Sequence, residues 1–298
     1  MVKNKPLVTI GIPTYNRPES LEKAIKSAIN QTYINLEIII SDNCSSDDKV
    51  KEICLHYQNI DERISYFRQP ENKGMLFNYN FLVEQATGEY YFSLPDDDWL
   101  SENYIEECAN FLKDNKDYAI AFGKINFYNS DYSFLYSCPQ VSFEEVNYLN
   151  RIKLYCTTAI ISCLSYGLTS LSLAKEILEH SNDRLAGDWI CMIKILFVGK
   201  GKYIQNISYE ALNNGASKDI ESLKKYFNLT ELTIDNFWHF IAKDIVGSII
   251  FDDFYKNKLE RSEMVSLALH VNNTLMKNDI KPSFLTRVKN KLRRIYEK

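Results

Sequence analysis

The stretch that sets the fold is "LVTIGIPTYNRPESLEKAIKSAI", residues 7–29, which joins a strand pattern to a helix pattern through a short turn. Its start, residues 7–12, is mostly apolar and contains β-branched residues, as buried strands do. The apolar residues after the turn repeat at the spacing of one helical face: Leu21, Ala24, Ile25, Ala28 and Ile29. A strand followed at once by a helix predicts an α/β fold.

The same alternation continues to residue 128. It predicts strands at 36–41, 63–69, 89–94 and 118–128, and helices at 47–58, 74–87 and 102–114. Because ligands of parallel sheets bind outside the carboxyl ends of the strands, the polar segments at those ends are expected to converge on one crevice. These segments are "PTYNR" (13–17), "DNCSS" (42–46) and "PDDDW" (95–99).

Beyond residue 128 the pattern is looser. It predicts helices at 143–162, 172–180 and 188–199, short strands at 165–171 and 202–205, and helix from about 219 onward. We therefore predict a catalytic-type domain over 1–218, with a first half at 1–127 and a second at 128–218. A helical extension follows at 219–298, in which residues 234–255 are apolar enough for a core helix or for the interface of a homodimer.

Composition and charge indicate an ordinary globular protein. The net charge of −4 argues against a nucleic-acid binder, and seven cysteines without a CxxC pair indicate reduced thiols in the cytoplasm. The chain starts without a signal-peptide pattern, and no apolar run approaches the roughly 20 residues that span a bilayer.

The tail at 281–298 differs from the rest, with seven Lys or Arg against one acid. Phe284 and Val288 lie near one helical face, which is the pattern of an amphipathic helix on an anionic membrane surface. A solvated helix resting on the protein body is the alternative. The expected location is cytoplasmic, with peripheral attachment to the inner face of the cytoplasmic membrane if the tail binds lipid.

Three adjacent carboxylates, Asp96, Asp97 and Asp98, follow the apolar strand at 89–94. Adjacent like charges repel each other in a partly desolvated place, so something must compensate them. One alternative is that they precede a helix start, with Asp98 or Ser101 as the cap. The other is a divalent cation, since Mg²⁺ and Mn²⁺ are bound by one or two carboxylates together with ligand phosphates.

An ordered set of motifs makes the chain similar to a known family. P-T-Y-N-R, S-D-N-x-S-x-D, N-x-G…N, A-x-G-E-Y and the acidic motif run from residue 7 to about 127. In this order they resemble the glycosyltransferases of family 2. The resemblance implies the GT-A fold, a Rossmann-like mixed sheet flanked by helices.

The resemblance also implies inverting transfer of a sugar from a nucleoside diphosphate donor. A UDP-sugar is expected, with dTDP- and CDP-sugars as alternatives. The acceptor would be a hydroxyl of a saccharide or lipid-linked glycan in bacterial surface-polysaccharide synthesis. The residues that match the donor site are Pro13, Thr14, Tyr15 and Arg17 in the first loop, Asp42 at the nucleobase, and Asn72, Lys73 and Gly74 near the uracil or phosphates. Several have plain structural alternatives: Pro13 can end a strand, Tyr15 can be core, and Asp42 and Gly74 can be turn residues.

The acidic motif departs from the family pattern, because Pro95 takes the place of its first acid. Asp97 then matches the acid that binds Mn²⁺ or Mg²⁺, with Asp98 as a second ligand, and Asp96 is left for the ribose or the metal. This departure puts the ribose contact in doubt more than the metal site.

The family's catalytic base lies in an acidic pair before a helix, which "AGDWICMIKI" (186–195) resembles. The pair reads Gly187-Asp188 here, so Asp188 is the predicted base and Asp183 the fallback. The alternative is that Asp188 only caps the helix. The segment 210–217 resembles a flexible loop that can close over the donor diphosphate, but it lacks the basic or histidine residue sometimes found there. Lys218 beside it is a candidate contact, and a solvated lysine is the alternative.

The sequence leaves two rival functions open. Pro95 and the missing acid before Asp188 allow a non-catalytic relative that binds nucleotide or sugar. A dehydrogenase or methyltransferase would need a glycine-rich turn after the first strand, and "PTYNRP" has no GxGxxG.

Overall fold

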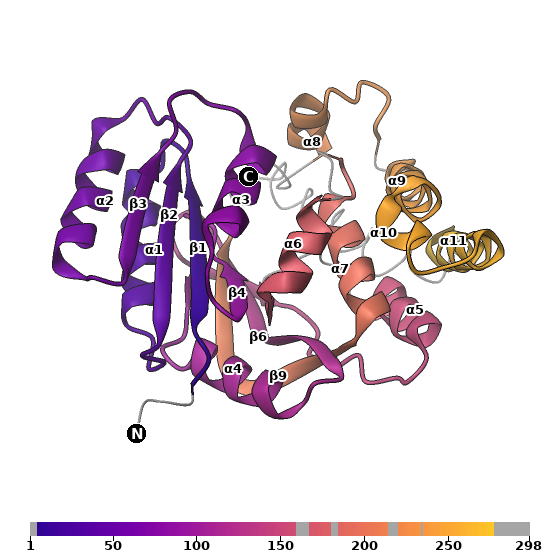
Figure 1. The fold of residues 1–298 in the computed structure, drawn as a ribbon. Helices are drawn as coiled ribbons and strands as arrows, with labels where there is room; N and C mark the ends of the chain where they lie inside the picture. The colour runs from indigo at the N-terminus through magenta and orange to yellow at the C-terminus, as the bar shows by residue number, and fades with distance from the viewer. Residues whose placement is uncertain (1–4, 159–166, 180–183, 214–219, 234, 277–298) are drawn as a thin grey trace.

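The computed structural model describes residues 5–158, 167–179, 184–213, 220–233 and 235–276. In these residues a mixed sheet of nine strands is flanked by helices, and the C-terminal helices gather at one end of it (Figure 1). The mixed α/β fold predicted from the sequence is confirmed. The domain boundaries at 127 and 218 stay predictions, and one sheet takes strands from both sides of residue 127.

The first half follows the predicted alternation closely. Its elements are β1 (Val8–Thr14), α1 (Pro18–Ile29), β2 (Leu36–Asp42), α2 (Asp48–Ile60), β3 (Ile64–Arg68), α3 (Met75–Gln85) and β4 (Tyr90–Ser93). The strands are parallel in the order β3-β2-β1-β4. Neighbouring residues of β2 point to opposite faces: Ile38 belongs to the main core, and Ile39 packs in a second cluster with Leu82 and Val83 of α3. Both faces of this part of the sheet are therefore covered by helices.

The part of the domain after β4, residues 99–212, adds antiparallel strands to the same sheet. Its elements are β5 (Trp99–Leu100), α4 (Tyr104–Asp114), β6 (Tyr118–Tyr128), β7 (Phe134–Ser137), α5 (Tyr148–Thr158), β8 (Leu168–Ser170), α6 (Leu171–Glu179), α7 (Gly187–Val198) and β9 (Lys200–Leu212). The strand β8 lies antiparallel between β4 and β6, while β9 runs parallel to β6 and antiparallel to β5. The carboxyl ends of β6 and β9 therefore lie at the same edge of the sheet as that of β4.

Three predicted boundaries are wrong in the part of the chain after residue 128. The strand expected at 202–205 extends over Lys200–Leu212, because it pairs along nearly all of β6. The start of the loop expected at 210–217 is consequently strand, Asn213 is a turn residue, and 214–217 lie outside the described residues. The helix expected at 143–162 begins only at Tyr148, since Phe143 forms a bridge with Gly201 of β9.

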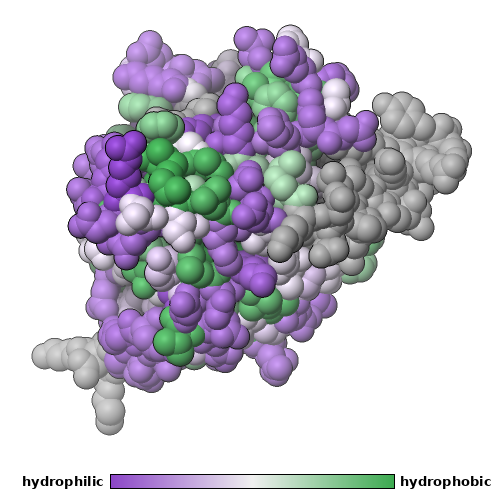
Figure 2. Space-filling view, turned by 90° about the vertical axis from the view of Figure 1, so that its right-hand side faces the viewer, coloured by the Kyte–Doolittle hydropathy of each residue, from purple (hydrophilic) through white to green (hydrophobic). Residues whose placement is uncertain are grey.

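The extension contains α8 (Ile220–Phe227), α9 (Phe237–Phe251), α10 (Asp253–Lys256) and α11 (Arg261–Met276). Of the two interpretations of 234–255, the core helix is confirmed, since α9 buries Trp238, Ile241 and Ile245. A homodimer stays a prediction. No helix among the described residues is long and apolar enough to cross a membrane. The end of the molecule that α11 forms faces the viewer in Figure 2, where separate apolar areas lie among hydrophilic ones. The basic tail lies outside the described residues, so its membrane helix stays a prediction.

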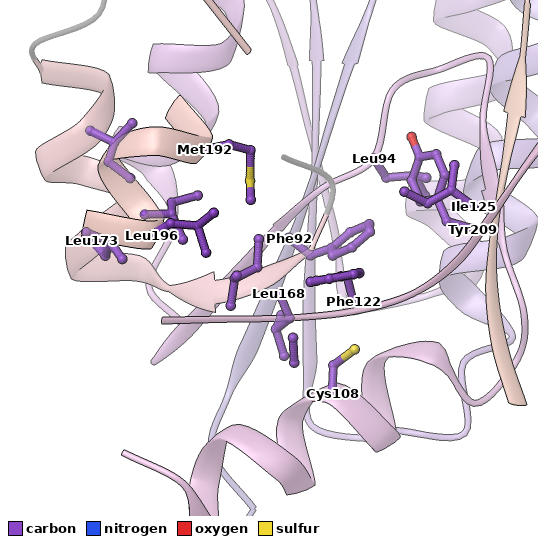
Figure 3. Packing of buried hydrophobic residues seen from close by; sticks show 14 of the residues in the cluster. Phe92, Leu94, Cys108, Phe122, Ile125, Leu168, Leu173, Met192, Leu196 and Tyr209 are labelled. Carbon is purple, nitrogen blue, oxygen red and sulfur yellow. The ribbon is translucent and has the colours of Figure 1, made fainter. Parts of the chain in front are cut away.

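The main core fixes the strand that leads into the acidic segment. Figure 3 shows Phe92 of β4 among buried residues from α4, β6, β8 and β9. Its ring lies 5.4 Å from that of Tyr104 and 6.3 Å from that of Tyr209, measured between centroids. Strand β4 is therefore packed against both halves of the chain just before the aspartates begin.

A buried ion pair joins α7 to the C-terminal helices. Lys194 is fully buried, and its Nζ lies 3.3 Å from Asp252 at the end of α9. Arg184 lies 3.6 Å from the same carboxylate, and the Ser248 hydroxyl donates to it. Just before α7, the backbone N–H of Ala186 donates to Asp244 at 3.3 Å. The extension thus holds both the start and the middle of α7.

Candidate active site

The three polar segments at the strand ends form one hydrogen-bonded cluster. The Thr14 hydroxyl donates to Asp96 Oδ2 at 2.8 Å, and the backbone N–H of Asn43 donates to the Thr14 carbonyl at 3.0 Å. The N–H of Asn16 donates to the Ser45 hydroxyl at 2.9 Å. The predicted convergence of residues 13–17, 42–46 and 95–99 is confirmed.

Asp96 is buried and bonded on both oxygens. Its Oδ2 accepts from Thr14 and from the backbone N–H of Tyr15 at 3.2 Å, and its Oδ1 accepts from the Arg17 guanidinium at 3.0 Å. Burial raises the pKa of Asp96 from 3.8 to about 6, with a further rise from the charge of Asp97; Arg17 opposes both. The carboxyl is therefore costly to ionise, and Arg17 reduces that cost.

Arg17 supplies the cation between two of the aspartates. The same guanidinium nitrogen that contacts Asp96 lies 2.8 Å from Asp97 Oδ2. Asp97 is buried, which raises its pKa, and the Arg17 charge opposes that rise. Because a guanidinium keeps its charge in proteins, Arg17 compensates the repulsion between the adjacent carboxylates of Asp96 and Asp97.

Asp98 points toward the second half of the chain. Its carboxylate accepts from the Tyr209 hydroxyl and, at 3.0 Å, from the backbone N–H of Leu212. Burial and the nearby Asp97 charge raise its pKa well above the ordinary value. The helix-start interpretation of the three aspartates is wrong, because α4 begins at Tyr104 with Asn103 as its N-cap.

On the nucleotide side, Asp42 is fully buried at the end of β2. It accepts from the backbone N–H of Ser45 at 2.8 Å and from the Tyr66 hydroxyl at 3.0 Å, and Arg68 lies 3.6 Å away. Burial, with the Asp42 charge, raises the pKa of Tyr66, so this hydroxyl stays a donor. These contacts hold Asp42 in place. Sequence reasoning missed Tyr66 and Arg68, although Arg68 ends a strand at the expected edge.

The loop at 72–74 packs beside the end of β2, on the same side of the cluster as Asp42. The Asn43 amide donates to Asn72 Oδ1 at 2.9 Å and to the Gly74 carbonyl at 3.0 Å, and Asn43 Oδ1 accepts from the backbone N–H of Lys73 at 3.1 Å. Gly74 has a φ of 88° directly before α3, a backbone conformation that is strained for any residue with a side chain. The predicted residues Asn72, Lys73 and Gly74 therefore lie against the "DNCSS" segment.

The first loop contributes one buried and one exposed residue. Pro13 is buried inside β1, which continues to Thr14, so Pro13 does not end the strand. Tyr15 is 44% exposed, so the interpretation of this ring as core is wrong. An exposed ring beside Asp96 is available for contact with a flat ligand.

Asp188 lies in the first turn of α7. The helix begins at Gly187 with Ala186 as its N-cap, and no side chain caps it, so Asp188 is not the cap. Burial raises the pKa of Tyr79 in α3 well above the ordinary value, and the charges of Asp188, Asp97 and Asp96 raise it further. Tyr79 therefore lies within electrostatic range of both the predicted base and the acidic cluster, which the apolar pattern of α3 did not indicate. Asp183 and Lys218 lie outside the described residues.

With this geometry established, comparison with known proteins identifies the family. The model of "Glycosyl transferase family 2" matches residues 9–178, more than half of the chain. The chain belongs to glycosyltransferase family 2. The match includes all three segments of the cluster and Tyr79, and it ends before Asp188.

Relatives of this family 2 chain include several bacterial transferases. It is 42% identical over 119 residues to a GalNAc(5)-diNAcBac-PP-undecaprenol beta-1,3-glucosyltransferase of Campylobacter jejuni, covering 40% of this chain and 38% of the relative. It is 30% identical over 224 residues to a chondroitin synthase of Pasteurella multocida, covering 73% and 22%. A putative teichuronic acid biosynthesis glycosyltransferase of Bacillus subtilis is 27% identical over 226 residues, covering 74% and 84%. The chain therefore spans well under half the length of the first two relatives.

Solved structures support the fold. S. aureus TarS 1-349, crystallised in complex with UDP-GlcNAc, matches with a TM-score of 0.62 at 17% identity, covering 95% of this chain and 76% of TarS. The predicted GT-A fold of this family 2 chain is confirmed by that match.

The family implies a divalent metal, and the acidic cluster was tested for one. No group of three or more His, Cys, Asp or Glu side chains that could hold a metal occurs among the described residues. Asp96 and Asp98 are bonded on both oxygens, whereas in the described part of the chain Arg17 is the one side chain hydrogen-bonded to Asp97. The residues therefore fit Mg²⁺ or Mn²⁺ held by one carboxylate and a ligand diphosphate, and Asp98 has fewer free lone pairs to offer than Asp97.

Proposed function

We propose that this chain is an inverting glycosyltransferase that moves a sugar from a UDP-sugar to a hydroxyl of a saccharide or lipid-linked oligosaccharide in bacterial polysaccharide synthesis. The observation that carries the proposal is the single hydrogen-bonded cluster of the three strand-end segments. Such a cluster at the carboxyl ends of parallel strands is where this class of fold binds its ligands.

The donor would lie over the ends of β1 and β2. The exposed ring of Tyr15 would stack on the nucleobase, with Asp42 as the acceptor for its ring N–H. Asn72, Lys73 and Gly74 would close the side of the pocket. The complex of TarS with UDP-GlcNAc, which has the same fold, supports the choice of UDP.

The diphosphate would lie near Asp97 and Arg17. Asp97 would hold Mg²⁺ or Mn²⁺ when the metal is bound, and the metal would supply positive charge that stabilises the leaving diphosphate. Arg17 would turn part of its guanidinium toward the same oxygens, because it is 43% exposed and lies 2.8 Å from Asp97.

In the transfer step, Asp188 would take the proton of the acceptor hydroxyl. The hydroxyl oxygen forms a bond to the anomeric carbon as the bond from that carbon to the diphosphate oxygen breaks. UDP leaves with the electron pair, and configuration at the anomeric carbon inverts because attack is in line. Asp188 is exposed at the start of α7, where an acceptor can reach it.

The acceptor class is supported by the relatives. The Campylobacter enzyme is named for an undecaprenol-linked glycan, and the Bacillus enzyme for teichuronic acid. A lipid-linked acceptor agrees with the basic tail at 281–298, which we propose attaches the protein peripherally to the cytoplasmic membrane.

The first test is thermal stability with UDP, CDP, GDP and dTDP, each with and without Mn²⁺. A ligand that binds only the folded protein stabilises it by about 2.7 kcal/mol at a hundredfold excess over its Kd. We expect UDP with Mn²⁺ to raise the Tm of the wild type, and Asp97→Asn to lose the metal-dependent part. The proposal is wrong if no nucleotide shifts the Tm.

The second test separates catalysis from binding. Asp188→Asn should keep the UDP-induced shift in Tm while release of UDP from UDP-sugar falls by about 100-fold or more, as loss of a general base does. Asp114→Asn, an exposed acid on α4, is the matched control and should keep full activity. Equal turnover in Asp188→Asn and wild type would remove Asp188 from the mechanism.

A further inference from the structure

The turn that joins β6 to β7 presents two aromatic rings to solvent. We call residues 128–134 the aromatic turn. In it Tyr132 is 44% exposed and Phe134 is 59% exposed. The Phe134 ring lies 5.9 Å from that of Tyr128, in an edge-to-face arrangement. Adjacent exposed rings on a soluble protein mark a binding surface more often than single ones do.

The aromatic turn is held in one conformation by its own hydrogen bonds. The backbone N–H of Asn129 donates to the Ser133 carbonyl at 2.9 Å, and Asp131 accepts from the Ser133 backbone and hydroxyl at 2.9 and 2.6 Å. Tyr132 has a φ of 64°, which a bulky residue adopts only at a cost. Strain of this kind concentrates at functional sites, where it sets a ring in place before the ligand arrives.

A lysine of helix α1 makes a cation–π contact with the ring of Tyr132. Lys23 Nζ lies 3.1 Å from the ring centroid of Trp99 and 4.0 Å from that of Tyr132. The Trp99 ring itself lies 5.7 Å from Tyr132 and 5.3 Å from Tyr128. Cation–π contacts of a partly buried lysine with two rings fix the turn against α1, the helix that begins directly after Arg17.

The aromatic turn is also connected to the acidic cluster. Trp99 directly follows Asp98 in the chain, and the backbone N–H of Leu212 donates to Asp98. The next residue, Asn213, donates its N–H to the Tyr128 carbonyl at 2.9 Å. The two exposed rings therefore belong to the same edge of the sheet as Asp96 and Asp97.

We propose that the aromatic turn is a binding surface for the acceptor saccharide, with Tyr132 and Phe134 stacking on pyranose rings. A pyranose has an apolar face of C–H groups and a rim of hydroxyls. Exposed rings fit the face, and the side chains of Asn129, Asp131 and Ser133 beside them fit the rim. The nucleobase is assigned to Tyr15 on the other side of the cluster, so it does not compete for this surface. The inference rests on the proposed transferase function, because that function requires a saccharide near Asp97.

The test compares ring-removing variants with matched controls. Tyr132→Asn keeps a residue that tolerates positive φ, and Phe134→Ser removes an exposed ring, so the double variant should fold. Tyr226→Asn on α8 and Phe251→Ser on α9 remove rings that are 42% and 72% exposed elsewhere. All proteins are titrated with lactose, maltose and N,N′-diacetylchitobiose by saturation-transfer NMR, in the presence of UDP and Mn²⁺.

We expect saturation transfer to pyranose C–H protons in the wild type and in the controls. The Kd of the bound disaccharide should rise by about tenfold in the Tyr132→Asn/Phe134→Ser variant. The shift in Tm caused by UDP should be the same in all proteins. If the wild type binds UDP but shows no saccharide signal, or the variant keeps the wild-type Kd, the inference is wrong. If the wild type fails to bind UDP, the proposed function itself fails, and the two failures are thus distinguished.

Discussion

The cost of keeping Asp96 ionised can be measured directly. In the folded protein its pKa is about 6, against an ordinary value of 3.8, mainly because the carboxyl is buried. A difference of 2.2 in pKa corresponds to about 3 kcal/mol, since each unit is worth about 1.36 kcal/mol. Ionised Asp96 therefore lowers the free energy of unfolding by about 3 kcal/mol at neutral pH.

The sign follows from proton binding. Between pH 3.8 and 6 the folded state holds a proton on Asp96 that the unfolded chain has released. Stability therefore falls as the pH rises through this window. About 2 kcal/mol of the total is lost between pH 4 and 7, where the protein can be studied folded. Asp97 and Asp98 also have raised pKa values and add slopes of the same sign.

The assay is urea unfolding of the wild type and Asp96→Asn at intervals from pH 4 to 7, without nucleotide or metal. Asparagine cannot ionise, so the variant should gain about 2 kcal/mol relative to the wild type across this range. Asp117→Asn is the control, because the exposed ion pair with Lys200 lowers the pKa of Asp117. Asp117 therefore titrates below about pH 4, and its substitution should leave the slope between pH 4 and 7 almost unchanged. Parallel curves for the wild type and Asp96→Asn would show that the Asp96 pKa is not raised by burial.

Two further predictions concern stability. Gly74→Ala should cost about 1–3 kcal/mol through its positive φ alone, because an added Cβ meets nothing within 4 Å. Gly247→Ala, equally unhindered inside α9, should instead stabilise the protein by about 0.5–1 kcal/mol. Urea unfolding measures both changes, and changes of the same sign would contradict the reasoning. Lys194→Met should cost about 3 kcal/mol, because among the described residues it leaves Arg184 as the one cation paired with Asp252. A change under about 1 kcal/mol in the same assay would show that Lys194 is not charged.

The first half of the fold was predictable because each element carries its own pattern. Strand β2 is a continuous apolar run, and α1 has one apolar face, so neither depends on distant partners for its identification. Strand β9 was predicted far too short. Its residues 206–211 alternate polar and apolar side chains, a strand pattern that the prediction passed over, and they pair with β6, a contact between distant segments.

The site was predictable in its location and less so in its contacts. The position of polar segments at strand ends was enough to bring Thr14, Asn43 and Asp96 together. The partner that compensates the aspartates was not predictable, because Arg17 reaches Asp96 across 79 residues of chain and Asp98 turns instead toward Tyr209. Side-chain direction at a strand end depends on packing that a sequence pattern does not contain.

The pairing of β5 with β9 has a consequence for how this enzyme fold assembles. Asp98 finds its partners only when Tyr209 and Leu212 arrive, more than a hundred residues later in synthesis. Until then Asp98 lacks the Tyr209 hydroxyl and the Leu212 N–H that satisfy it in the fold, so the acidic segment reaches its native packing only after the late strand pairs. A fragment that ends at residue 178, where the family match ends, would keep every donor-side motif and lack the strand that closes them.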